Sequence, residues 1–364
     1  MSNELEQWAQ DPTKAGTLPY AAFEPKYAHE GVGAAVVVRA ALYFRGGYTA
    51  DKRESLSWAL DAYIKLAKLA CGDDPNPLRW LWFNGKPALP IAKAPALSDL
   101  ATRVGDNEGF DAIYVGGKTA REASFYQFKT FCLERFQAEL GTRGLDVLEF
   151  SLPAPFVRAN PEPFVKLFEE SAAVVDAVHG HAGLAVNLSP TGRNENESSE
   201  YFIAQQLGSG VDVGDPIAMK VRKLTDRIKT VDWLTLIDDG MLHRVGHIPA
   251  LQSELPKAWF SLQPCSQGAL IRAGVVPQAG GPQEDGQPGT PPPAYVVLNA
   301  ALRNVVAESL GSLQRGTVSG DAPVHNTTPS SDAWLRRFDV SPDELLRAKA
   351  AVLDTTKLPG SGEA

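Results

Sequence analysis

Short runs of β-branched and aromatic residues alternate along the chain with longer stretches in which apolar residues recur at helical spacing. The run AAVVVRAALYF (34–44) ends at Gly46-Gly47, which is typical of a central strand. The next segment places one set of apolar residues on a single helical face: Leu56, Leu60, Tyr63, Ala67 and Ala70. LRWLWF and KPALPIA follow, separated by Asn84-Gly85, a pair that suits the type I′ turn of a hairpin. The N-terminal part is therefore predicted to be strand, helix and hairpin.

The middle of the chain contains one ambiguous segment, ASFYQFKTFCLERFQAEL (123–140). Thr119 and Glu122 before it fit a helix cap, whereas its content of Phe, Tyr and Thr favours a strand that pairs with LDVLEFSLP (145–153). The strand is the preferred interpretation. FDAIYVGG and AGLAVNL are predicted to be further strands, and Asn160-Pro161 is predicted to open a helix.

The C-terminal part repeats the order of the first elements. VDWLTLI is predicted to be a strand, a helix is expected around IPALQSEL, and AWFSLQ with GALIRAGV resembles a hairpin. A further helix is expected around 295–305. These elements predict an α+β fold of mixed or antiparallel sheets covered by helices, with strand–helix–hairpin units near both ends.

The expected domain organisation follows composition. Residues 1–30 form a polar lead-in, and residues 31–315 form the main domain, for which two lobes, 31–190 and 191–315, are one interpretation. Residues 316–364 form a polar tail with a short helix in SPDELLRAKAAVL. The stretch GGPQEDGQPGTPPP (280–293) is typical of a turn-rich loop without regular structure.

Composition and charge limit the partners. The chain has 364 residues, of which 44% are hydrophobic and 21% charged, as in folded proteins. A formal net charge of −8 argues against a nucleic-acid ligand and favours a basic protein partner. The three cysteines show no CxxC spacing, which argues against a disulfide framework and structural zinc. No signal peptide and no apolar run of the roughly 18 residues needed to span a bilayer are found, so we expect no membrane partner and a cytoplasmic protein.

Two groups of residues could carry chemistry. In HGHAG, His179 and His181 could form half of a metal site, or His179 could end a helix with Gly180 as a left-handed stop. The helix end is favoured because no carboxylate or third histidine stands at ligand spacing.

The second group is the aspartate pair of VDWLTLIDDGML. Asp238 and Asp239 could be the carboxylates of a metal-dependent enzyme, or a turn and helix N-cap, which is favoured because no partner residue follows. We predict no catalytic residue, metal or cofactor. A metal-dependent hydrolase that uses Asp238, Asp239, His179 and His181 is the alternative.

An ordered set of motifs resembles a known family: VRAALYFRGGYTADKRESL, LEFSLP, HGHAGLAV, LGSGVDVGDP, VDWLTLIDDGML, GALIRAGVVPQAG and WLRRFD. From about Val38 to Asp339 the chain resembles the type VI immunity proteins, which contain the DUF3396 domain and counter VRR-Nuc nuclease toxins. It departs from the pattern at AGVVPQAGGPQED, where the family commonly has AGP-x-P-x-GD.

The resemblance implies a non-enzymatic protein that binds a co-inherited toxin of a type VI secretion system in a 1:1 complex. Such toxins are nucleases of the PD-(D/E)xK type, bound at or near the active site. The resemblance also implies that Trp233, Leu234 and Leu236 are core residues. A structural component of the secretion machinery is a third hypothesis.

One segment, SPTGRNENESSEYFIAQQLGSGVDVGDP (189–216), gathers acidic residues with Arg193 as the basic residue among them: Glu195, Glu197, Glu200, Asp212 and Asp215. Because the segment follows a predicted core strand, we expect an exposed loop–helix–loop rim. Taken singly, each carboxylate is most simply interpreted as a solvated surface residue. As a group they are the predicted partner-binding site, because carboxylates complement the basic groove of a nuclease.

Overall fold

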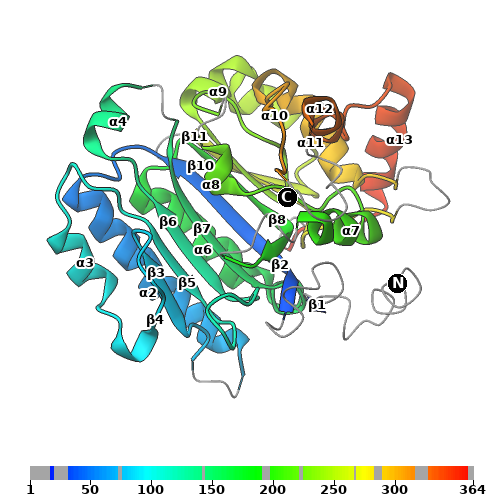
Figure 1. Ribbon diagram of the computed structural model, residues 1–364. Helices are drawn as coiled ribbons and strands as arrows, with labels where there is room; N and C mark the ends of the chain where they lie inside the picture. The colour runs from blue at the N-terminus through cyan, green and yellow to red at the C-terminus, as the bar shows by residue number, and fades with distance from the viewer. Residues whose placement is uncertain are drawn as a thin grey trace.

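The computed structural model describes residues 17–19, 32–72, 76–141, 144–190, 197–220, 224–265, 268–282, 289–315 and 327–359. In this part of the chain, helices flank one open antiparallel sheet with the strand order β10-β11-β9-β8-β2-β7-β6-β5-β3-β4, and β1 pairs with β2 (Figure 1). The predicted α+β class is confirmed. The sheet is continuous, however, where several sheets were expected.

The strands are β1 (Thr17–Pro19), β2 (Val32–Phe44), β3 (Trp80–Phe83), β4 (Leu89–Pro90), β5 (Ala112–Val115), β6 (Gln127–Phe131), β7 (Asp146–Pro153), β8 (His179–Leu188), β9 (Leu234–Asp238), β10 (Phe260–Cys265) and β11 (Gly268–Ala273). The α-helices are α2 (Ala50–Ala70), α3 (Leu97–Arg103), α4 (Arg135–Glu139), α5 (Ala154–Ala159), α6 (Pro161–Val175), α7 (Glu197–Leu207), α8 (Pro216–Met219), α9 (Asp239–Arg244), α10 (His247–Glu254), α11 (Pro293–Leu302), α12 (Thr328–Leu335) and α13 (Pro342–Leu353). Two 3₁₀ turns, η3 (Ile91–Lys93) and η5 (Arg303–Val305), complete the described elements.

Strand β2 is the centre of the sheet. Every residue after Val32 in it is buried, and it pairs along its length with β7 on one side and β8 on the other. Ala40, for example, lies between Phe150 and Ala182. A strand buried on both faces needs apolar residues at nearly every position rather than at alternate ones. The run from Ala34 to Phe44 has this character, so its sequence already indicated a central strand.

Helices α2 and α6 cover one face of the sheet. The Tyr63 hydroxyl of α2 donates to the Ser151 carbonyl of β7 (3.0 Å), and the Phe150 ring lies 6.2 Å from Tyr63 and 5.7 Å from Phe164 of α6. Since Phe150 pairs with Ala40, the even-numbered residues of β2 face these two helices. Their apolar faces and the sheet form the main core.

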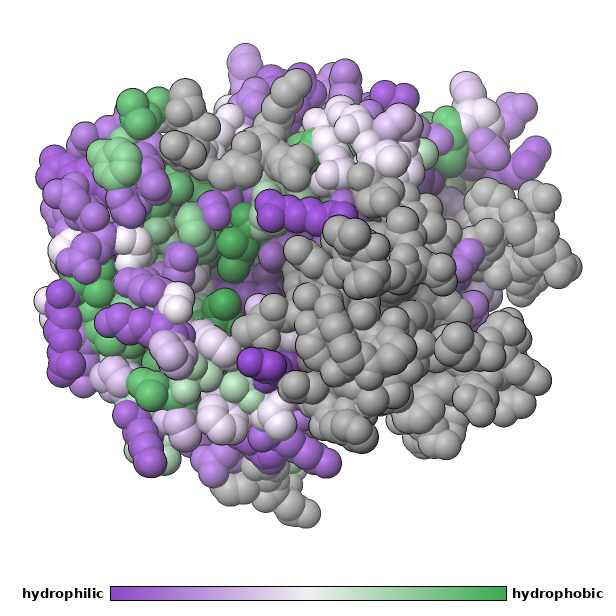
Figure 2. Space-filling model, viewed as in Figure 1, coloured by the Kyte–Doolittle hydropathy of each residue, from purple (hydrophilic) through white to green (hydrophobic). Residues whose placement is uncertain are grey.

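Helices α7 and α8 lie on the opposite face, in front of the strands in Figure 1. The Tyr43 hydroxyl donates to the Pro216 carbonyl at the start of α8 (3.2 Å), so the odd-numbered residues of β2 point this way. Figure 2 shows the molecule from this side: hydrophilic side chains dominate the margin formed by α2 and α3, and hydrophobic ones show in patches nearer the middle.

The strand–helix–hairpin order occurs near both ends, as predicted. It is β2, α2 and the β3–β4 pair in the first part, and β9, α9, α10 and the β10–β11 pair in the second. Asn84 and Gly85 have the positive φ angles (46° and 69°) that a type I′ turn requires. The ambiguous segment contains both structures: β6 pairs with β7, as preferred, and α4 follows it.

The sheet extends across the predicted boundary between the two lobes. Strand β8 ends just before position 190 and pairs with β9, so the sheet crosses the predicted lobe boundary. The two-lobe division stays a prediction. The tail contains α13, which matches the predicted helix, and α12 before it. Most of the polar lead-in, and residues 283–288 of the predicted loop, lie outside the described residues.

Trp233 is the largest fully buried side chain of the second part. Its ring stacks on Phe164 at 6.0 Å, its indole nitrogen donates to the Gly274 carbonyl (3.1 Å), and the Arg272 guanidinium lies 5.6 Å from its ring. Leu234 and Leu236 are buried beside it. The expectation that these three residues pack in the core is confirmed.

We expect Trp233→Ala to lower the free energy of unfolding by about 3–5 kcal/mol, because it removes buried contacts and leaves a cavity. Urea unfolding measures this. Leu346→Ala on α13 is the control: with 66% of this residue exposed, the change should stay within about 0.5 kcal/mol. Equal effects of the two substitutions would contradict the placement of Trp233.

Candidate functional site

The predicted acidic rim is mostly buried. Glu195 lies outside the described residues. Glu197, Glu200 and Asp212 are at most 3% exposed, and only Asp215 among the described four is partly accessible. The expected exposure is therefore wrong for three carboxylates. The reason is tertiary: the segment does not project from the sheet but packs as α7 against β8 and β2.

Asp212 is the centre of a buried ionic network. Its carboxylate oxygens lie 3.1 Å from Arg39 Nη2, 2.6 Å from Lys229 Nζ and 3.3 Å from His181 Nε2. Burial by itself would raise the pKa of Asp212, but Lys229, His181 and Arg39 hold it well below its usual value. The carboxylate is thus ionised and neutralises cations on the face of β2.

Glu197 and Glu200 tie α7 to a distant part of the chain. Glu200 accepts a hydrogen bond from the Gly214 amide (3.0 Å) and another from the Gln314 side chain (2.7 Å). Glu197 accepts one from the Arg315 amide (2.6 Å). Asp215 caps α8 by accepting from the Ile217 amide (3.2 Å). These carboxylates have internal partners, and a partner-binding role for the segment stays a prediction.

The two histidines lie on β8, so the predicted helix end at His179 is wrong. Helix α6 ends at Val175, and Asp176 takes the left-handed conformation (φ 49°) that was assigned to Gly180. Gly180 serves close packing instead, since a Cβ there would lie 2.6 Å from a methyl of Leu42. The odd positions of β8 place His179 and His181 on the α7–α8 face.

Both imidazoles are buried and have separate partners. His179 Nε2 donates to the Leu224 carbonyl (2.7 Å), and its ring stacks on Tyr43 at 4.6 Å. Burial lowers the pKa of His179 to about 3 and also lowers that of His181, which contacts Asp212. The folded state therefore favours neutral rings at both positions.

The aspartate pair forms a turn and a helix cap, as preferred from the sequence. Asp238 is the N-cap of α9 and accepts from the Met241 amide (2.7 Å), and Asp239 is exposed in the first helical turn. Among the described residues, no three His, Cys, Asp or Glu side chains are grouped so that they could hold a metal ion. The residues of the hydrolase alternative are thus not assembled into such a group.

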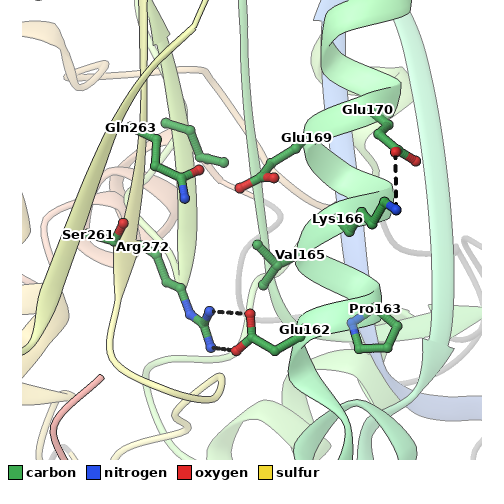
Figure 3. Close-up of a pocket in the computed structure, with 10 residues that line it drawn as sticks. Glu162, Pro163, Val165, Lys166, Glu169, Glu170, Ser261, Gln263 and Arg272 are labelled. Atoms are coloured by element: carbon green, nitrogen blue, oxygen red, sulfur yellow. Dashed lines mark hydrogen bonds and ion pairs between the residues drawn. The ribbon is translucent and has the colours of Figure 1, made fainter. Parts of the chain in front are cut away.

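An open groove, not foreseen from the sequence, lies between α6 and the β10–β11 hairpin (Figure 3). It has a volume of about 650 Å³. Val165 and Glu169 of α6 form one wall, and Gln263, Leu270 and Arg272 of the hairpin form the other. A second hollow of about 450 Å³ shares Glu169, Glu170, Gln263 and Leu270 with it and continues along α6. We call the two together the α6–β10 groove.

Two of the three carboxylates that line the α6 side of the groove form ion pairs, and the third, Glu169, does not. Arg272 donates to both oxygens of Glu162 (3.0 and 2.8 Å), and Lys166 lies 3.7 Å from Glu170. Glu169 points into the groove and forms no ion pair or hydrogen bond with any residue in the described part of the chain (Figure 3). Burial raises the pKa of Glu169, Arg272 offsets part of this, and Glu162 and Glu170 add to it. In the sequence, the signal that could have indicated this surface is the set of polar positions on the amphipathic helix α6.

The described helices have one further property in common. None of them is both long enough and apolar enough to cross a membrane.

The structure thus combines a buried ionic network around Asp212 with an open groove beside α6. The sequence model of the family described as type VI immunity for VRR-NUC matches residues 55–338. A solved structure, the Pseudomonas aeruginosa T6SS protein PA0821, is similar with a TM-score of 0.87 and 29% identity, over 99% of this chain and 98% of that one. No curated protein matches the chain. The chain belongs to the family of type VI immunity proteins for VRR-NUC, as its motifs predicted.

We expect the contribution of His179 to the free energy of unfolding to fall as the pH is lowered from 7 towards 4. His179 has a pKa of about 3 in the folded protein and 6.5 as a free side chain, so between these values the unfolded chain binds a proton that the folded one does not. The loss is at most about 1.4 kcal/mol per pH unit. Urea unfolding over this range measures it.

His179→Gln provides the matched comparison, because the Gln amide can still donate to the Leu224 carbonyl. This variant should be less stable at neutral pH and show a shallower pH dependence than the original protein. Equal slopes would contradict the buried neutral imidazole.

Replacing Asp238 and Asp239 together with Asn should lower the free energy of unfolding by no more than about 1 kcal/mol, since Asn is also a good N-cap. Toxin protection should remain nearly intact. A growth assay with the cognate effector, with circular dichroism to check folding, tests this. A folded double variant without protection would show that the carboxylates have a functional role.

Proposed function

We propose that this protein neutralises a cognate type VI secretion effector by direct binding. The effector is a nuclease of the PD-(D/E)xK class, similar to VRR-Nuc, and the complex is 1:1. Binding covers the active site or the nucleic-acid-binding surface of the nuclease. The observation that carries this proposal is the family match over residues 55–338.

Charge supports a nuclease as the partner. A nuclease needs a basic surface for the phosphate backbone, and this chain has a formal net charge of −8. Opposite charges accelerate association and fix the orientation of the partners. The resemblance to a Pseudomonas aeruginosa T6SS protein over nearly the full length adds the secretion context. We place the encounter in the cytoplasm, where a nuclease toxin meets nucleic acid.

Inhibition in this proposal is stoichiometric and not catalytic. The central test titrates a purified candidate nuclease effector with increasing amounts of this protein, using a labelled nucleic acid as substrate. Nuclease activity should fall linearly and vanish near one equivalent.

Complete inhibition by a small fraction of an equivalent would instead show turnover, as an enzyme would produce. Absence of both inhibition and complex formation at low salt would overturn the proposal for this effector. An acidic protein of unrelated fold and similar net charge is the control for nonspecific electrostatic binding.

We expect the association rate to fall as salt rises, because screening weakens long-range attraction between the acidic protein and the basic nuclease surface. The dissociation rate should change much less. Stopped-flow measurements at several salt concentrations separate the two rates, and a salt-independent association rate would contradict electrostatic steering.

A further inference from the structure

Two exposed histidines meet where α9 is followed by α10 (Figure 1). His243 Nδ1 lies 3.0 Å from His247 Nε2, and the ring centroids are 4.8 Å apart at an interplanar angle of 74°. Neither ring forms a further hydrogen bond or ion pair with a residue in the described part of the chain. The two imidazoles therefore contact each other and otherwise face solvent. We call residues 243–247 the α9–α10 corner.

The backbone of the corner brings the two rings together. Gly246 and His247 both adopt left-handed conformations, with φ angles of 85° and 64°. Glycine suits position 246 for a second reason, since a Cβ there would lie 2.8 Å from the Cβ of Ala250. Leu242 of α9 and Leu251 of α10 are both buried. The corner is thus anchored to the core on each side of the histidine pair.

The hydrogen bond by itself is a weak reason for this geometry. A neutral imidazole has one N–H donor and one acceptor nitrogen, so a single proton lies between His243 and His247. Exposed rings can form the same bond with water, and the net gain in stability is small. His247 nevertheless keeps a left-handed backbone, which is uncommon for a residue with a side chain. Backbone outliers of this kind are concentrated at functional sites.

The spacing of the two nitrogens matches that of two ligands on one metal ion. Bonds from zinc to histidine nitrogen are about 2.0–2.1 Å long. Bond angles of about 90–110° at the ion then separate the two nitrogens by about 2.9–3.4 Å, a range that includes the observed 3.0 Å. Once the shared proton has left, small rotations of the exposed rings direct both lone pairs at one ion.

The neighbouring charges are compatible with a bound cation. Arg244, next to His243, is paired with Asp226, whose carboxylate lies 3.3 Å from its Nη1. Asp239 is exposed one turn before His243 and adds negative charge to this side of α9. It does not complete a set of three ligands, since the described residues contain no such group. Two histidine ligands leave the remaining positions of the ion for water.

We propose that His243 and His247 bind a divalent transition-metal ion of the zinc, nickel and copper class at the α9–α10 corner. Imidazole nitrogen suits these ions, whereas magnesium and calcium prefer oxygen ligands. The ion replaces the shared proton and connects the end of α9 to the start of α10. The site departs from the sequence-based expectation of no metal, and it is independent of the proposed function.

The test is isothermal titration calorimetry of the full-length protein after EDTA treatment and dialysis, with Zn²⁺, Ni²⁺, Cu²⁺ or Mg²⁺ as the titrant. The original protein is compared with His243→Ala, His247→Ala and Cys265→Ser. Cys265 is an exposed thiol at the end of β10, so its variant is the control for metal bound by another soft ligand. Circular dichroism checks that the variants, all at exposed positions, keep the fold.

We expect one equivalent of Zn²⁺ to bind, and each histidine variant to weaken this binding at least about tenfold, because half of the protein ligands are lost. Cys265→Ser should leave the affinity within about twofold of the original. Cu²⁺ should bind more tightly than Ni²⁺ or Zn²⁺, and Mg²⁺ should not bind. The electron paramagnetic resonance spectrum of the Cu²⁺ complex should show coupling to two imidazole nitrogens, which either histidine variant removes.

Three outcomes would overturn the site. Equal Zn²⁺ affinity in the original protein and both histidine variants would place the metal elsewhere. Loss of binding in Cys265→Ser alone would assign the metal to the thiol. Absence of Zn²⁺ binding at millimolar concentration would show that the histidine contact is a hydrogen bond only. These measurements use the protein without its effector, so their failure leaves the proposed function in place.

Discussion

The structure depends on the burial of β2 on both of its faces. Its even-numbered residues pack under α2 and α6, and its odd-numbered residues face α7 and α8. The strand also carries Arg39 at its centre, at 3% exposure. A buried guanidinium is tolerated only if it is paired and hydrogen-bonded. Arg39 therefore requires Asp212, and with it the whole segment that brings Asp212 over the sheet.

This requirement explains why the acidic segment is internal. Asp212 also neutralises Lys229 and contacts His181, and the nearby Glu200 binds the Gly214 amide and Gln314. Segments from four distant parts of the chain meet in this network. A buried network is stabilising only when its members are all satisfied, and removal of one member leaves an uncompensated charge. The carboxylates that the sequence suggested for a partner-binding site thus hold α7 and the segment after it against the sheet.

The two ends of the sheet differ in their cover. At the β3–β4 end, β4 is short and ends at Pro90, and η3 follows it directly. At the β10–β11 end, the hairpin extends beyond α6 and leaves the groove. The ion pairs of Asp212 lie inside the molecule, whereas Glu169 faces the open groove.

The sequence by itself determined most of the elements, because periodicity and turn residues are local signals. The apolar run of β2, the Asn84-Gly85 turn, the Asn160-Pro161 helix start and the Asp238 cap each depend on residues within a few positions. The ordered motifs also indicated the family. Only the tertiary structure decided which charges are buried and where the open surface lies. The partner of Glu197 is 118 positions away and that of Glu162 is 110 away. The sequence favoured a helix end at His179, and only the pairing of β8 with β2 and β9 places this residue in a strand. Burial and pairing depend on contacts between segments far apart in the chain, and no local pattern of residues encodes them.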